Sequence, residues 1–179
     1  MAVSYPWFKA AVIALLVCNT AVFFATGTAT EALDAAAWLV LLASFELETG
    51  WGNRFRESPG PTILRGVRLG AAFAIVAAAI GYIRGGEWLD AVNVGLWIAV
   101  VALLEFEIRR PQAVAPHRAW FAAVATLLYC GLGVMVLVWA GRGEWFDAYD
   151  ALLWLVAFVT IEIDVFNVTR KVTAESPPG

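Results

Sequence analysis

Carboxylates recur at fixed spacing in three segments of this 179-residue chain. The segments align without gaps over eighteen residues: an acid is followed three residues later by Asp or Asn, seven later by Trp, fifteen later by Glu and seventeen later by a second acid. Acids in apolar sequence suit the binding of a cation or the carriage of a proton. The aligned residues are Glu31, Asp34, Trp38, Glu46 and Glu48; Asp90, Asn93, Trp97, Glu105 and Glu107; and Asp147, Asp150, Trp154, Glu162 and Asp164.

Helical geometry places most of these positions on one face. At 100° per residue, the first acid, the Asp or Asn, the Trp and the Glu share a stripe about 120° wide, whereas the last acid points elsewhere. If the three stripes face the centre of a helix bundle, their inner acids form a ring of carboxylates. The Asp, Asn and Trp residues of each stripe then lie on the same helix face as that ring. We therefore predict a cation or proton site at Glu46, Glu105 and Glu162, with Glu48, Glu107 and Asp164 beside it.

Depth argues that some of these acids lie below the lipid headgroups. In each segment an uncharged stretch precedes the inner Glu. It has eleven residues after Asp34, fourteen after Asp90 and eleven after Asp150. At 1.5 Å per residue these windows measure roughly 18 to 22 Å, less than a hydrocarbon core of about 30 Å. The inner acids are also expected at the C-terminal ends of their helices, where the helix dipole disfavours an acid by about 0.3 to 1 kcal/mol.

Salt bridges offer a structural alternative for the inner acids. Arg68 is the predicted counter-charge, because its position along the chain places it at the depth of Glu46 and Glu105. Glu105 and Arg109 also form an i,i+4 pair in the favourable order. Two functions stay open: a protein that binds or conducts a cation or proton, or a non-catalytic scaffold or accessory subunit whose acids tie helices together. Helix capping explains the outer acids Glu31, Glu87 and Glu144.

The elements that must position these residues are membrane helices. The chain is 61% apolar and only 15% charged, against roughly 25% charged in soluble domains. We predict an all-α polytopic membrane protein, with six transmembrane helices as three parallel-repeat hairpins in a pseudo-threefold bundle. One domain covers 1–172, and its repeats cover approximately 5–52, 61–111 and 116–169; the segment 49–61 is expected to be a mobile linker and 173–179 a disordered tail. The expected spans are 7–26, 35–45, 69–83, 91–104, 119–140 and 151–161.

Basic residues predict the orientation. Ten of the twelve Lys and Arg residues fall in alternate connections and tails, which indicates that these face the cytoplasm. We expect an inner (plasma) membrane protein with both termini cytoplasmic. The short connections that hold Glu31, Glu87 and Glu144 then face outward.

Composition also restricts the classes of ligand and partner that the chain could bind. The net charge of −3 and the lack of a basic run disfavour nucleic acid. Two Cys and one His are too few for a zinc, bis-His haem or iron–sulfur centre, and no Ser/His/Asp set or phosphate loop is present, so we expect no enzyme and no cofactor. Expected partners are membrane lipids, protons or metal cations, and a membrane-protein partner under the scaffold alternative. Small residues at Gly66, Gly70, Ala77 and Gly81 predict close helix approach.

Overall fold

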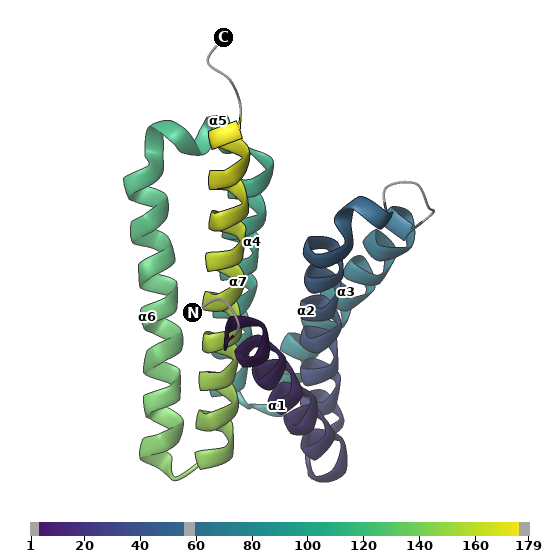
Figure 1. Ribbon diagram of the computed structural model, residues 1–179. Helices are drawn as coiled ribbons and strands as arrows, with labels where there is room; N and C mark the ends of the chain where they lie inside the picture. The colour runs from purple at the N-terminus through teal and green to yellow at the C-terminus, as the bar shows by residue number, and fades with distance from the viewer. Residues whose placement is uncertain (1–3, 56–59, 176–179) are drawn as a thin grey trace. The chain divides into compact units, whose positions relative to one another are not determined.

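The computed structural model describes the backbone of residues 4–55 and 60–175, and the side chains of 7–47, 62–107 and 109–160. Within these residues the secondary structure is helical without a strand, which confirms the all-α prediction. Short turns join the long helices in pairs, and a short helix and a 3-10 turn connect α4 with α6 (Figure 1). The elements are α1 (Ser4–Thr26), α2 (Ala29–Phe55), α3 (Gly60–Gly85), α4 (Trp88–Arg109), α5 (Pro111–Val114), η1 (Ala115–His117), α6 (Arg118–Arg142) and α7 (Trp145–Glu175).

Four stretches of the described chain are long and apolar enough to cross a membrane: Trp7–Thr26, Thr62–Gly85, Trp88–Glu107 and Pro111–Arg142. This finding supports the membrane class. α2 and α7 are not among the four, and both carry the acids of the aligned segments along their length. Six spans therefore stay a prediction.

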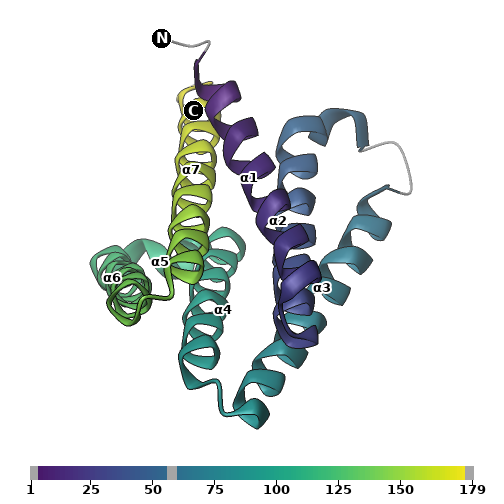
Figure 2. The ribbon, with the colours of Figure 1, turned by 90° about the horizontal axis from the view of Figure 1, so that it is seen from below.

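The chain forms two compact units, one of residues 17–131 and the other of residues 1–16 and 132–179. In the first unit α2 packs along α3, whereas α3 and α4 meet near the turn that joins them and then diverge (Figure 2). Gly81 permits the first of these contacts, because a Cβ there would lie 2.8 Å from Cγ2 of Thr30. Gly66 and Gly70 have no described atom within 4 Å of such a Cβ, so the close approach predicted for them is not seen in this part of the chain.

Two of the interhelical turns have the same geometry. Gly86 and Gly143 follow α3 and α6 with φ of +77° and +81°, a region that glycine enters without a Cβ clash. The Glu87 N–H donates to the Tyr82 carbonyl and the Glu144 N–H donates to the Trp139 carbonyl, both over 2.9 Å. These are the six-to-one hydrogen bonds of a Schellman motif, which reverses the chain sharply after a helix.

Burial follows the aligned positions from one hairpin to the next. The side chain four residues after the first acid is buried in all three segments, and the side chain two residues after it is exposed in all three. Equivalent positions therefore face the same way on their helices. The buried set is Ala35, Val94 and Ala151; the exposed set is Leu33, Val92 and Tyr149.

Two expected boundaries differ from the helices. α2 continues to Phe55 and α3 begins at Gly60, so the described residues of the predicted linker 49–61 are helical, and 56–59 lie outside the description. Glycines 50 and 52 cost about 1 kcal/mol each in a helix, which a long helix tolerates. α7 continues through Glu175, so only residues 176–179 of the predicted tail lie outside the description.

Candidate functional site

The tryptophans of the repeated stripe are the best-defined part of the candidate site. Trp38, Trp97 and Trp154 are 6%, 4% and 8% exposed, so the stripe points into the protein in each segment. The rings of Trp38 on α2 and Trp97 on α4 contact each other, with centroids 6.2 Å apart and planes tilted by 58°. This geometry is favourable for two aromatic rings. The structure thus brings two equivalent residues of different hairpins together.

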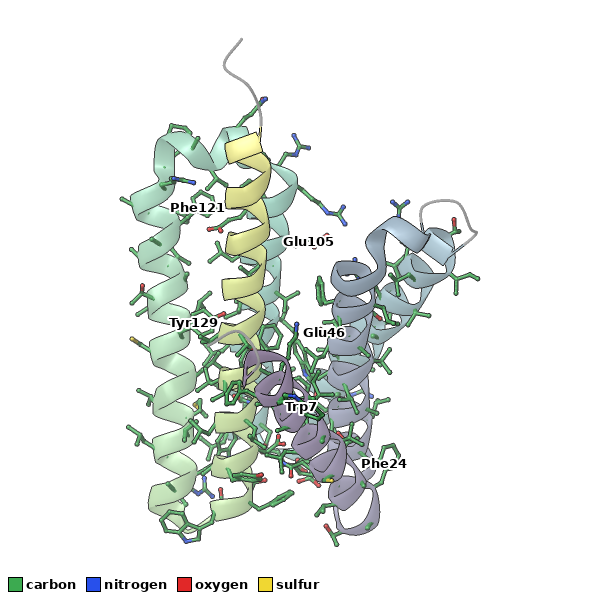
Figure 3. The ribbon with its side chains drawn as sticks, viewed as in Figure 1. Trp7, Phe24, Glu46, Glu105, Phe121 and Tyr129 are labelled. Carbon is green, nitrogen blue, oxygen red and sulfur yellow. The ribbon has the colours of Figure 1, made fainter. Side chains whose placement is uncertain are left out.

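The inner acids take different environments. Glu46 is half-buried on α2, and Glu107 is half-buried on α4 (Figure 3 labels Glu46 and Glu105). Glu105 accepts a hydrogen bond from Arg109 and forms an ion pair with it, which confirms the predicted i,i+4 pair. The side chains of Glu48, Glu162 and Asp164 lie outside the described residues, so the convergence of three acids stays a prediction.

The helix-dipole argument is wrong for two of the three inner acids. α2 extends nine residues beyond Glu46, and α7 extends thirteen beyond Glu162. The dipole acts mainly within the last turn, so only Glu105, four residues before the end of α4, meets it. Arg109 supplies the compensation there. The case for a site at Glu46 and Glu162 therefore depends on their recurrence and depth.

Arg68 on α3 contacts the residue that precedes the inner acid Glu46 on α2. Its guanidinium carbon sits 4.3 Å from the centroid of the Phe45 ring, and Phe45 directly precedes Glu46. Arg68 is half-buried on α3, a helix that packs along α2. A cation over an aromatic face is stabilised when water is excluded. An ion pair of Arg68 with Glu46 or Glu105 stays a prediction. Of the two acids, Glu46 is the neighbour in sequence of Phe45, which Arg68 contacts.

Replacement of Arg68 by Ala is expected to destabilise the detergent-solubilised protein by roughly 3 kcal/mol, because a carboxylate at depth loses its counter-charge. A second change, Glu46→Gln or Glu105→Gln, should recover part of the loss if that acid is the partner. Unfolding of the single and double variants measures this coupling. Arg65→Ala, at an exposed position on the same helix, is the control. Strict additivity of Arg68→Ala with both Glu variants would show that the pairing is wrong.

A second polar cluster lies at the opposite end of α2 and α3. The buried Tyr82 side chain, 4% exposed, donates a long hydrogen bond of 3.5 Å to Oδ2 of Asp34. The charges that act on the Tyr82 hydroxyl come from Asp34 most strongly, then from Asp90, Glu31 and Glu87. Acids at the starts of two helices, α2 and α4, thus act on one buried hydroxyl of α3.

Asn93 occupies the position on α4 that is equivalent to Asp34. Its Oδ1 atom is buried and has no hydrogen-bond partner among the described residues. A buried acceptor without a partner is unfavourable unless water or another donor reaches it. Asp150, the third residue at this position, is half-buried on α7. The outer part of the stripe is therefore polar and enclosed.

The outermost acids have structural roles, as their position at helix starts predicts. The Thr28 N–H donates to Oε2 of Glu31 over 2.5 Å, and the Glu31 N–H donates to the Thr28 hydroxyl, which together form a capping box at α2. Glu87 is the N-cap residue of α4, but its side chain makes no capping hydrogen bond, so capping is confirmed for Glu31 alone. Glu144 forms an ion pair of 3.1 Å with Arg142.

The sequence interpretation missed Tyr82. A signal for it exists, since an aromatic residue stands eight positions before the first acid in every segment: Phe23, Tyr82 and Trp139. Among these three, only Tyr82 carries a hydroxyl. These aligned aromatic residues lie near the C-terminal end of the first helix of each hairpin, close in sequence to the outer acids.

No three His, Cys, Asp or Glu residues of the described chain come close enough together to hold a metal ion. No family model, curated protein or solved structure matches the chain.

Proposed function

We propose that this chain is an integral membrane protein of six spans, in three parallel helical hairpins, that binds or conducts a proton or cation through the carboxylates of α2, α4 and α7. The observation that carries the proposal is the contact between Trp38 and Trp97. Because each Trp shares a helix face with an inner Glu, this contact supports an inward orientation for the faces that carry Glu46 and Glu105. Burial of Trp154 supports the same orientation for α7.

The matching burial and turns support a pseudo-threefold arrangement. Side chains fifteen positions before the first acid, Leu16, Ile75 and Leu132, are 1%, 3% and 1% exposed. The Schellman turns at Gly86 and Gly143 also coincide in hydrogen bonding. Equivalent faces buried in each hairpin are the expected result of hairpins related by an axis along the membrane normal.

A proton fits the described groups better than a multivalent cation. Tyr82 and Asp34 already form a hydroxyl–carboxylate hydrogen bond, and such groups can exchange protons along a polar path. Desolvation favours the neutral form of a carboxylic acid, so an acid at depth gains from binding a proton. The inner acids Glu46, Glu105 and Glu162 would provide the cytoplasmic end of this path and the Asp34–Tyr82 pair the outer end.

A non-catalytic scaffold or accessory subunit is the second candidate, and one observation favours it. Glu105 forms an ion pair with Arg109, as a structural acid would. Under this alternative the remaining acids tie helices or subunits together. A stable membrane-protein partner would then accompany the purified protein.

Proton flux tests the proposal directly. The protein is reconstituted in liposomes that contain a pH-sensitive dye, and a pH gradient is imposed with valinomycin and potassium to balance charge. The proposal predicts that the dye reports faster acidification of the liposome interior than in protein-free liposomes. A protein that passes neither protons nor monovalent or divalent cations, and that co-purifies with a stable partner, would favour the scaffold.

Cysteine labelling tests the proposed orientation in the inner membrane, with both termini cytoplasmic. Gly86 and Gly143 are unsuitable sites, because their positive φ would strain a cysteine. The exposed residues Arg142 and Gln112 are suitable sites on the two expected sides of the membrane. We expect Arg142→Cys to react with an impermeant maleimide in spheroplasts, and Gln112→Cys to react only after the membrane is opened.

The labelling needs a background without native thiols. Cys18 and Cys130 are exposed on their helices, so both are first changed to Ala. Reaction of Gln112→Cys in intact spheroplasts, with protection of Arg142→Cys, would reverse the orientation.

A further inference from the structure

The connection between α4 and α6 is a short basic segment that the proposed function does not use. Arg110 lies between α4 and α5, and His117 and Arg118 lie at the junction of η1 and α6. All three are exposed. The segment follows the candidate span Trp88–Glu107 and includes the first residues of the apolar stretch Pro111–Arg142, in which the long helix α6 begins only at Arg118. We therefore place it where the chain leaves and re-enters the hydrocarbon core.

Among the side chains that the structure describes, the acids leave two arginines of this segment without an ion pair. Arg109 forms its ion pair with Glu105, but Arg110 and Arg118 form no ion pair with a described side chain. The turn at the other end of α6 differs, because Arg142 pairs with Glu144 over 3.1 Å. Two arginines within nine residues thus keep their guanidinium groups available at the membrane surface.

Aromatic rings fix the helix ends beside these arginines. Phe106 on α4 and Phe121 on α6 stack with centroids 5.7 Å apart and planes 6° from parallel. Trp120 meets Phe121 edge-on at 5.3 Å and is itself 62% exposed. Figure 3 shows Glu105 and Phe121 near the α5 end of their helices. An exposed Trp at the end of an apolar helix suits the headgroup region of a bilayer.

We propose that Arg110 and Arg118, with His117 and Trp120, form a binding surface for the phosphate group of an anionic phospholipid. Guanidinium groups hold phosphate oxygens through paired hydrogen bonds, which lysine cannot reproduce. The Trp120 indole covers the upper acyl chain while its N–H remains in the headgroup layer. Anionic lipid is the occupant that charge complementarity favours, since basic residues at the membrane surface attract it. The inference concerns the lipid boundary and does not depend on proton flux.

Native mass spectrometry of the full chain in mild detergent tests this surface. The protein is titrated with dioleoyl phosphatidylglycerol and, in parallel, with dioleoyl phosphatidylcholine. We expect the wild type to retain phosphatidylglycerol preferentially, and Arg110→Gln/Arg118→Gln to lower that retention roughly tenfold or more. Arg84→Gln/Arg142→Gln removes the same charge from the opposite helix ends and should keep the preference.

Three results would overturn the proposal: no preference in the wild type, an equal loss in both double variants, or displacement of the lipid by inorganic phosphate at equal concentration. If the double Gln variant does not fold, Arg110→Lys/Arg118→Lys replaces it. That variant keeps the charge but loses the paired hydrogen bonds, so it should bind phosphatidylglycerol more weakly than the wild type. Equal binding by the Lys variant and the wild type would contradict the arginine-specific site.

Discussion

Simultaneous replacement of Glu46, Glu105 and Glu162 by Gln is expected to abolish proton or cation flux in proteoliposomes while the protein stays folded. Gln preserves the size and polarity of Glu but neither releases a proton nor neutralises a cation. The acids recur at one position of three segments, and at least one acid per segment should lie at membrane depth. Single variants show whether one acid dominates. Glu105→Gln is expected to have the smallest effect, because Arg109 already neutralises that carboxylate.

The matched control changes three other acids, Glu31, Glu87 and Glu144, together to Gln. These residues cap or flank helix starts, and Gln retains the capping-box hydrogen bond at α2. We expect less than about a threefold change in flux, through surface electrostatics alone. Retained flux in the inner triple variant, with both proteins correctly folded, would remove Glu46, Glu105 and Glu162 from the pathway.

Helical periodicity explains most of what the sequence could predict. A stripe of Trp and acids at 100° per residue has one consistent inward face, and the three Trp residues are buried as that geometry requires. The Glu105–Arg109 ion pair could also be predicted from the sequence, because i,i+4 spacing brings two side chains together within one helix. Both predictions use local geometry only.

Helix ends and interhelical contacts were harder to predict. Hydropathy falls after Phe45, yet α2 continues to Phe55, since a polar sequence can stay helical beyond the apolar stretch. Tyr82 was missed because its role depends on α2 and α3 lying side by side, which brings it to Asp34, 48 residues away in sequence. Small residues predicted close helix approach at Gly66, Gly70 and Gly81. Gly81 lies against Thr30 of α2, whereas Gly66 and Gly70 have open space among the described atoms.

The central claim of the proposal is that the acid-bearing faces of α2, α4 and α7, the second helix of each hairpin, converge. Disulfide cross-linking between equivalent positions of α2 and α7 tests it without any assumption about the ligand. Ala35 and Ala151 are buried at the same position of their segments, and alanine-to-cysteine changes add little volume. Leu33 and Tyr149 lie near the same depth on the exposed side of the same helices and serve as the matched control pair.

In membranes from a background without Cys18 and Cys130, copper phenanthroline should oxidise the Ala35→Cys/Ala151→Cys pair to a disulfide within one chain. Peptide mass spectrometry identifies that bond and separates it from a disulfide between two chains. A disulfide requires Cα atoms within about 7 Å, so its formation reports a direct approach of the two helix faces. The account predicts this intrachain disulfide for Ala35→Cys/Ala151→Cys and none for Leu33→Cys/Tyr149→Cys; the reverse pattern, or no disulfide in either pair, would contradict it.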